Sequence, residues 1–273
     1  MALTGIERLV LVGCGKMGGA LLEGWLALGL EARAVAVLDP SPPPEAEALI
    51  ARAGIALNPP SPAIADVIVV AMKPQTMGAV LGSLAAWAGP ETLVVSIAAG
   101  TPIKAFEAVF GPATAIVRSM PNTPASIGRG MTVGVANASA SAEQRARAEA
   151  LMSAVGAFDW VEDEDLIDAV TAVSGSGPAY VFHLVEALTA AGIAEGLPAA
   201  LAAKLARGTV EGAGELLRRS ALDPATLRQN VTSPGGTTAA ALEHLMDPQD
   251  GLEPLMARAV SAARRRGKAL GGS

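Results

Sequence analysis

Two glycine-rich stretches of this 273-residue chain have residue types and spacing that could do chemistry. The first is Ser233-Pro234-Gly235-Gly236-Thr237-Thr238, which follows Asn230 and precedes an alanine-rich helical pattern. Proline and paired glycines end a helix, and the two threonines are expected to open the next one. Backbone N–H groups at a helix start, with hydroxyls beside them, are typical of a site for a small carboxylate. Simple helix capping by Ser233, Thr237 or Thr238 is the commoner use of such residues and stays open as an alternative.

The second stretch is Gly13-Cys14-Gly15-Lys16-Met17-Gly18, which lies between an apolar run and a helical pattern. Its spacing is that of a dinucleotide-binding loop, with glycines for a tight turn, for approach of the pyrophosphate and for helix packing. Asp39 ends a second apolar run, at the distance where an acidic residue holds the cofactor ribose. The pattern predicts a nucleotide site, with Cys14 as a small filler and not a nucleophile.

Strand-like apolar runs alternate with helical patterns through the first part of the chain. The runs cover 8–12, 34–38, 66–72, 92–97, 115–118, 131–136 and 158–161. This alternation predicts an α/β fold, namely a Rossmann-type, doubly wound parallel sheet. Ligands bind such sheets at the carboxyl ends of the strands, so the loops at Gly13, Lys73, Ala98 and Met120 are expected to line one crevice. Lys73 is either a cofactor contact or an ordinary surface charge.

Strand signals stop near residue 165. We therefore predict a dinucleotide-binding domain over 1–165 and an all-helical, substrate-binding and dimerisation domain over 166–273. Glu162-Asp163-Glu164-Asp165 is expected to be a solvated helix start, because acidic residues suit that end of the dipole. Later helices are predicted over 179–194, up to 219, from 224 to 230, and over 252–266. The many alanines and glycines suggest close helix contacts, including contacts between subunits.

Composition narrows the possible partners and the compartment. A net charge of −6 and a pI near 5.1 favour neither nucleic acid nor an anionic membrane. The single cysteine excludes an internal disulfide and fits a reducing compartment. The first residues lack the pattern of a secretory peptide, and no apolar run is long enough for a membrane span. We expect a cytoplasmic protein, and no metal site is predicted.

Five segments together resemble the pyrroline-5-carboxylate reductases over nearly the whole chain. They are Val12–Gly18, Met72–Gln75, Met120–Pro124, Val173–Tyr180 and Asn230–Thr238. The resemblance implies a Rossmann domain followed by a helical dimerisation domain, with dimers often assembled into decamers. It also implies the last step of proline biosynthesis, in which NAD(P)H donates hydride to the imine carbon of Δ1-pyrroline-5-carboxylate and L-proline forms.

The resemblance also assigns residues to the two ligands. Cofactor contacts are expected at Gly13, Cys14, Gly15, Lys16, Met17, Gly18, Asn58, Met72, Lys73, Pro74, Ala98 and Ala99, beside Asp39. Substrate contacts are expected at Asn230, Ser233, Gly235, Gly236, Thr237 and Thr238. N–H groups of Gly235, Gly236 and Thr237 suit the substrate carboxylate, and the Thr238 hydroxyl suits the ring nitrogen. Thr238 is the one residue assigned to catalysis, either as a proton donor or only as an orienting group.

Asp39 bears on the choice between NADH and NADPH. Members of the family that use the phosphorylated cofactor tend to have a small polar or basic residue after the second strand. Here Asp39 stands first, prolines follow, and no arginine comes before Arg52. A carboxylate accepts hydrogen bonds from a free ribose and repels a 2′-phosphate, which favours NADH or dual use. Asp39 could instead point away and cap the following turn.

Two other functions compete with this one. A β-hydroxyacid dehydrogenase resembles the chain around Gly175-Ser176-Gly177, but it needs a catalytic lysine where Val181 stands and an asparagine where Val185 stands. Valine cannot transfer a proton. A non-catalytic nicotinamide-nucleotide sensor is compatible with the fold, since one fold hosts many functions, but a sensor would not need the Ser233–Thr238 stretch.

Overall fold

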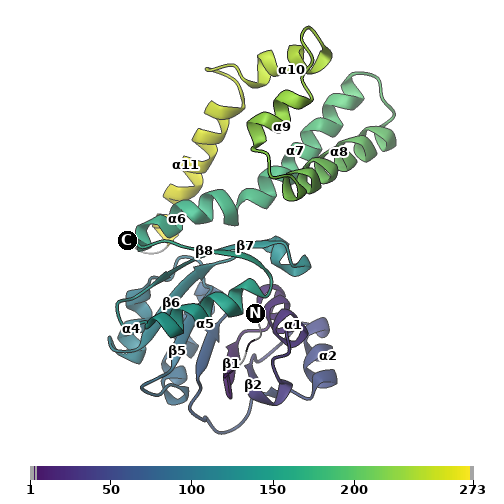
Figure 1. The fold of residues 1–273 in the computed structure, drawn as a ribbon. Coiled ribbons are helices and arrows are strands. Elements are labelled where there is room, and N and C mark those ends of the chain that lie inside the picture. The colour runs from purple at the N-terminus through teal and green to yellow at the C-terminus, as the bar shows by residue number, and fades with distance from the viewer. Residues whose placement is uncertain (1–2, 4, 271–273) are drawn as a thin grey trace. The chain divides into compact units, whose positions relative to one another are not determined.

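The computed structural model describes residues 3 and 5–270, and these form two compact units (Figure 1). The first unit takes the chain up to Gly175 and again from Ala263. The second unit spans Ser176–Ala262.

The first unit is built on one mostly parallel sheet. In chain order it contains β1 (Leu9–Val12), α1 (Lys16–Ala27), β2 (Val35–Leu38), α2 (Pro44–Ala53), β3 (Ala56–Leu57), β4 (Val67–Val70), α3 (Pro74–Val80), β5 (Leu93–Ser96), α4 (Ile103–Phe110), β6 (Ala115–Met120), β7 (Gly130–Ala136), α5 (Ala142–Ser153), β8 (Gly156–Trp160) and α6 (Ile167–Val170). The strand order is β3-β2-β1-β4-β5-β6-β7-β8. The chain therefore reverses direction across the sheet at β1, which is the position where doubly wound folds bind nucleotides.

One strand pair departs from the predicted parallel arrangement. β7 runs antiparallel to β6, with Val117 opposite Ala136 and Met120 opposite Val133, whereas β8 is parallel to β7. Only a short 3₁₀ turn, Thr123–Ile127, separates β6 from β7. A parallel pairing needs a longer crossover, so the short connection dictates the reversal.

Helices cover both faces of the sheet. Leu9 and Leu11 of β1 face a core that includes α1, α2 and α5, while Val10 and Val12 face a second core that includes α3, α4 and α6. Every residue of β1 is buried, which explains its uninterrupted apolar sequence. The glycine-rich loop after β1 is consequently attached to a fully buried strand.

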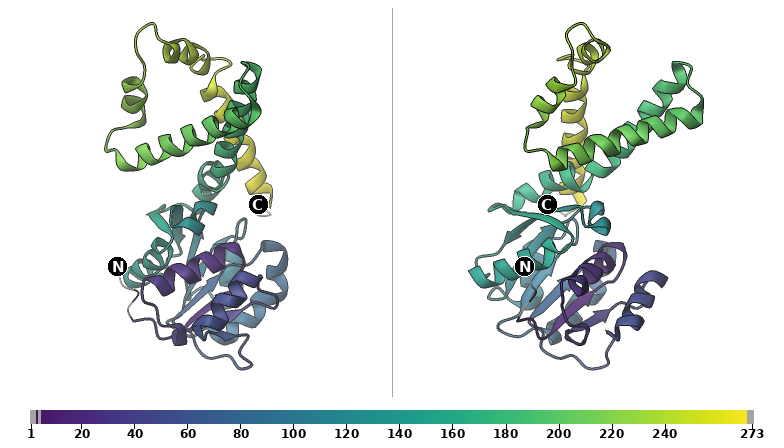
Figure 2. Two further views of the ribbon diagram at one scale, coloured as in Figure 1. Left: turned by 90° about the vertical axis from the view of Figure 1, so that its right-hand side faces the viewer. Right: turned by 45° about the vertical axis from the view of Figure 1, so that its right-hand side comes forward.

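The second unit consists of helices, as predicted. It contains α7 (Gly177–Ala194), α8 (Ala199–Arg219), α9 (Pro224–Asn230), α10 (Thr237–Leu245) and the start of α11 (Leu252–Leu270). α7 and α8 form an antiparallel hairpin (Figure 2), and small residues let them approach closely. A Cβ added at Gly192 would lie 3.2 Å from the Cβ of Ala202. Ala202 and Ala206 are the only buried apolar side chains that the structure describes between 176 and 262, so this unit has almost no core of its own.

Only Ser176 separates the helical segment that begins with α6 from α7. α6 continues into a π-helical turn, Thr171–Gly175, and α7 begins directly after Ser176 with Pro178 in its first turn. π-helical turns often occur at functional sites. In the described part of the chain, no helix is long and apolar enough to cross a membrane, and no group of three or more His, Cys, Asp or Glu could hold a metal ion.

Candidate active site

The carboxyl ends of four neighbouring parallel strands are in register. Val12, the last residue of β1, pairs with Leu38 of β2 and with Val70 of β4. Val70 in turn pairs with Ser96, the last residue of β5. The loops that begin at 13, 39, 71 and 97 therefore leave the sheet at one edge. The predicted cofactor residues after β1, β2, β4 and β5 lie in these loops or in the first turn of the helix that follows, and Asn58 directly follows β3.

The glycine loop has the geometry that a dinucleotide requires. Gly13 has a φ of +88°, and a Cβ there would lie 2.9 Å from the carbonyl oxygen of Ala71. A Cβ at Gly18 would collide with the carbonyl oxygen of Gly13. A Cβ at Gly15, in contrast, meets nothing within 4 Å. Two glycines thus serve the packing of the loop, and the third leaves open space beside the backbone, where a pyrophosphate can approach.

The start of α1 provides donors for an anion. Gly15 is the N-cap residue and has no side chain that could cap the helix. The N–H of Gly19 makes the first helical bond, to the carbonyl of Gly15 at 2.7 Å. The preceding N–H groups of Lys16, Met17 and Gly18 therefore have no acceptor within the helix. These groups and the glycine geometry fit the phosphates of a nicotinamide cofactor.

Asp39 is tied directly to the glycine loop. Its Oδ2 accepts a hydrogen bond from the N–H of Cys14 at 2.7 Å, and its Oδ1 accepts one from the N–H of Ser41 at 2.9 Å. Asn58 holds the backbone of Asp39 through both amide atoms, and it adopts a φ of +49° to do so. The carboxylate thus bonds the glycine loop and also caps the turn that follows, whereas its contact with the cofactor ribose stays a prediction.

Cys14 is buried and unreactive in this environment. Burial, and secondly the Asp39 carboxylate, raise the pKa of its thiol to about 11. The thiol is protonated at neutral pH, and only the thiolate is a good nucleophile. The prediction that Cys14 fills space is consistent with this environment.

The loops after β4 and β5 complete this edge of the sheet. Met72 is half-buried, Lys73 is the exposed N-cap residue of α3, and Pro74 is the first residue of that helix. Ala98 is buried, whereas Ala99 is exposed. The structure therefore brings the predicted cofactor residues of the first unit together at one edge.

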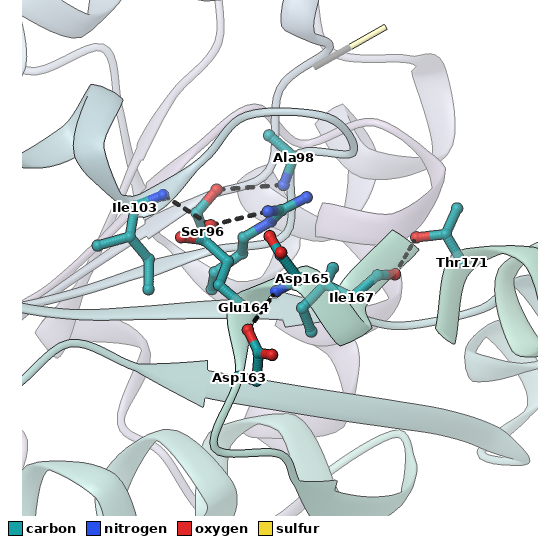
Figure 3. A network of polar contacts seen from close by, with 9 residues as sticks. Ser96, Ala98, Ile103, Asp163, Glu164, Asp165, Ile167 and Thr171 are labelled. Carbon is teal, nitrogen blue, oxygen red and sulfur yellow. Dashed lines mark hydrogen bonds and ion pairs between the residues drawn. The ribbon is translucent and has the colours of Figure 1, made fainter. Parts of the chain in front are cut away.

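Two charged residues that the sequence analysis did not select lie beside these loops. Glu164 Oε1 accepts a hydrogen bond from Arg118 Nη1 at 2.7 Å and another from the N–H of Ile103 at 2.9 Å (Figure 3). Glu164 was expected in a solvated helix start, and that expectation is wrong for this residue: its side chain is only 30% exposed, because it neutralises a buried guanidinium. The sequence signal for this ion pair was an arginine inside an apolar strand sequence, since a buried charge needs a partner of opposite charge.

The predicted substrate residues lie in the second unit, around the start of α10. Pro234 and Gly235 form a tight turn in which the N–H of Gly236 donates to the carbonyl of Ser233 at 3.0 Å, and Gly235 has a φ of +67°. Proline followed by a glycine of positive φ is the pattern of a type II turn. Asn230 is the last residue of α9 and is exposed.

The N-cap of α10 is Gly236, so no side-chain hydrogen bond caps this helix. The capping alternative for Ser233, Thr237 and Thr238 is therefore wrong. The first helical bond runs from Ala240 N to Gly236 O at 3.2 Å, which leaves the N–H groups of Thr237 and Thr238 without a helical acceptor. The N–H of Gly236, expected to bind the carboxylate, is already used within the turn.

This combination defines a class of protein. A glycine loop at the carboxyl ends of parallel strands, followed by a helical unit with an open helix start, is the architecture of a nicotinamide-dependent oxidoreductase. The model of the family "NADP oxidoreductase coenzyme F420-dependent" matches residues 8–100, and that of "Pyrroline-5-carboxylate reductase dimerisation" matches residues 164–270. The chain belongs to the pyrroline-5-carboxylate reductase family, as the following relatives show.

The curated relatives carry the name of this enzyme. Pyrroline-5-carboxylate reductase of Pseudomonas aeruginosa is 43% identical over 265 residues, which cover 96% of each chain. The enzyme of Synechocystis is 46% identical over 208 residues, or 76% of each chain. Among solved structures, a pyrroline-5-carboxylate reductase of Coxiella burnetii has a TM-score of 0.88, with 34% identity and 97% and 98% of the two chains covered. Plasmodium falciparum pyrroline carboxylate reductase with NADP bound has a TM-score of 0.78 at 28% identity, covering 98% of this chain and 100% of that one.

Proposed function

We propose that this chain reduces Δ1-pyrroline-5-carboxylate to L-proline with NADH or NADPH, the last step of proline biosynthesis. The observation that supports it most directly is the start of α10, where Gly236 leaves the first N–H groups uncapped beside two threonine hydroxyls. The substrate is a small cyclic imine with a carboxylate, and N–H groups at a helix start are suited to that anion. A bound reduced nicotinamide supplies the hydride that the imine carbon receives.

Different groups at the start of α10 bind the two polar groups of the substrate, its carboxylate and its ring nitrogen. The N–H groups of Thr237 and Thr238 hold the carboxylate, and Gly235 keeps the approach open, since a Cβ there would meet nothing within 4 Å. This assignment replaces the N–H of Gly236, which donates to Ser233. Ser233 and Asn230 flank the carboxylate. The Thr238 hydroxyl hydrogen-bonds the ring nitrogen and orients it, because a hydroxyl is too weak an acid to be the main proton source at neutral pH.

On the cofactor side, the N–H groups at the start of α1 hold the pyrophosphate, and Asp39 holds the adenosine ribose. The edge formed by Met72, Lys73, Ala98 and Ala99 takes the nicotinamide end. NADP is bound in the Plasmodium relative, which supports a nicotinamide cofactor in general. For this chain we propose NADH or dual use, because a 2′-phosphate would face the Asp39 carboxylate.

Self-association is part of the proposal. α7 has no buried residue, and its exposed apolar side chains include Phe182 at 65% and Leu184 at 46%. A helix with several exposed apolar side chains needs cover, and a second copy of the chain supplies it in a dimerisation domain. Decamers, the domain division at residue 165 and a cytoplasmic location also belong to the proposal; the match of the dimerisation model begins at 164.

The experiment that tests the function is a parallel assay of NADH and NADPH oxidation on addition of Δ1-pyrroline-5-carboxylate. We expect loss of nicotinamide absorbance with equimolar L-proline, and a higher rate or lower KM for NADH. Absence of oxidation with either cofactor, in protein shown to be folded, would contradict the reductase function and favour the sensor. A β-hydroxyacid dehydrogenase is not favoured, since Val181 and Val185 stand at its acid/base positions.

A further inference from the structure

We propose that Glu164 and Arg118 are positioning residues for hydride transfer: their ion pair holds the loop between β5 and α4, which contacts the nicotinamide. The inference rests on the proposed function only through the cofactor contacts at Ala98 and Ala99. All the residues that carry it lie in the first unit.

The loop between β5 and α4 is held at both ends. At its start, Ser96 Oγ accepts a hydrogen bond from the N–H of Ala98 at 3.2 Å, and the N–H of Ile97 donates to the carbonyl of Val70 at 3.0 Å (Figure 3). At its end, the N–H of Ile103, the first residue of α4, donates to Glu164. Ser96 is fully buried, so the start is attached to the sheet itself. The position of the other end depends on where the Glu164 carboxylate is.

Arg118 fixes that carboxylate. Its side chain is 9% exposed, and its partner in the sheet is Ser96, the residue from which the loop departs. Glu164 Oε1 accepts a hydrogen bond from the Arg118 guanidinium at 2.7 Å and another from the N–H of Ile103 at 2.9 Å. This one oxygen therefore connects β6 to the start of α4. If the carboxylate turned toward solvent, it would leave a buried guanidinium without an anion, which is strongly unfavourable.

The glycine loop, at the adenosine end of the proposed cofactor site, does not depend on the Arg118–Glu164 pair. The glycine loop is joined to β2 through the bond between Cys14 and Asp39, and its turn is packed against Ala71. Loss of the Glu164 carboxylate should therefore displace the nicotinamide end of the edge and leave the adenosine end in place. Small displacements of a reacting group reduce hydride transfer strongly, because the reacting atoms must be held at near-contact distance.

The test compares Glu164→Ala with the parent enzyme in two measurements. Single-turnover hydride transfer to Δ1-pyrroline-5-carboxylate is expected to fall about tenfold or more. The Kd of ADP-ribose, which lacks the nicotinamide, is expected to stay within about twofold of the parent, since the adenosine contacts are separate. Glu162→Ala is the matched control: that carboxylate is two residues away, its side chain is 81% exposed, and its removal should leave both measurements unchanged.

A second variant separates positioning from folding. Arg118→Met combined with Glu164→Gln leaves no buried charge unpaired and keeps an amide oxygen for the N–H of Ile103. We expect this protein to fold and bind ADP-ribose as the parent does, with hydride transfer still reduced several-fold. Unchanged hydride transfer in either folded variant would overturn the proposal, and so would an equal loss of NADH and ADP-ribose affinity. Inactivity of the parent enzyme itself would count against the proposed function instead.

Discussion

Asp39 and Cys14 are joined by a 2.7 Å hydrogen bond from the backbone N–H of Cys14 to Oδ2 of the carboxylate. The bond connects the end of β2 to the glycine loop, beside which we propose that the adenosine ribose binds. Asp39→Ser is expected to remove the charge that repels a 2′-phosphate, and so to raise the ratio of kcat/KM for NADPH over NADH about tenfold or more. Asp39→Asn, which keeps the shape without the charge, should shift the ratio in the same direction. An unchanged ratio in both variants would mean that the carboxylate does not face the ribose.

Variants of Thr238 should distinguish an effect on the substrate from an effect on the cofactor. In the proposed site, Thr238→Ala removes the hydroxyl that bonds the ring nitrogen, and we expect kcat to fall about tenfold or more, the effect of a lost substrate hydrogen bond. The Kd of NADH, measured by its fluorescence, should not change. Thr238→Ser retains the hydroxyl and is expected to recover most of the activity; parent-level turnover in the alanine variant would exclude this role.

Gly18 and Gly15 of the glycine loop should respond differently to alanine. A methyl group at Gly18 collides with the carbonyl of Gly13, so Gly18→Ala is expected to lower the free energy of unfolding by at least about 2 kcal/mol. A methyl group at Gly15 meets no protein atom within 4 Å, so Gly15→Ala should cost within about 1 kcal/mol of stability and yet weaken cofactor binding. Urea denaturation and cofactor titration check both. Equal stability of the two variants would contradict the packing described for the loop.

The raised pKa of the Cys14 thiol should lower the stability of the folded protein at alkaline pH. Burial and the Asp39 carboxylate raise its pKa to about 11 in the folded protein, whereas an exposed thiol has a pKa of 9.0. The unfolded state therefore loses its proton first as the pH rises, and the stabilising contribution is complete below pH 9 and is lost up to about pH 11. The difference in unfolding free energy between the parent and Cys14→Ala should shrink by about 2 kcal/mol over this window. Urea titrations of both proteins at the two ends of the window measure it, and a constant difference would refute the shift.

A substitution at Phe182 tests whether the chain self-associates through α7. It is 65% exposed on α7, and a charge in its place would be desolvated wherever α7 is covered by a second chain. Phe182→Glu is expected to lower the molar mass in solution, measured by light scattering, and to reduce the melting temperature. Leu57→Glu, an exposed leucine on β3 at the sheet edge of the first unit, is the matched control and should leave the mass unchanged. A parent enzyme that is already monomeric at micromolar concentration would contradict self-association through the helical unit.

Much of the local structure follows from the sequence alone. α8 ends at Arg219 and α9 spans Pro224–Asn230, as the proline, aspartate and apolar spacing predict, because the determinants of these boundaries lie within one or two turns. The strand–glycine-loop–helix unit at 9–27 is equally local. The family resemblance added the reaction, since its motifs are also contiguous segments.

Other features depend on contacts between distant segments, and only the tertiary structure decided them. The bond between Cys14 and Asp39 is of this kind. The pairing of Arg118 with Glu164 joins residues 46 positions apart. A run of four acidic residues looks solvated in sequence, because nothing local reveals a buried guanidinium on a strand that folds beside it. The sequence by itself determined which segments form most of the helices and strands. The packing of the sheet decided that Glu164 pairs with Arg118 at the end of the loop between β5 and α4, because a buried ion pair forms only when the fold brings both partners out of water together.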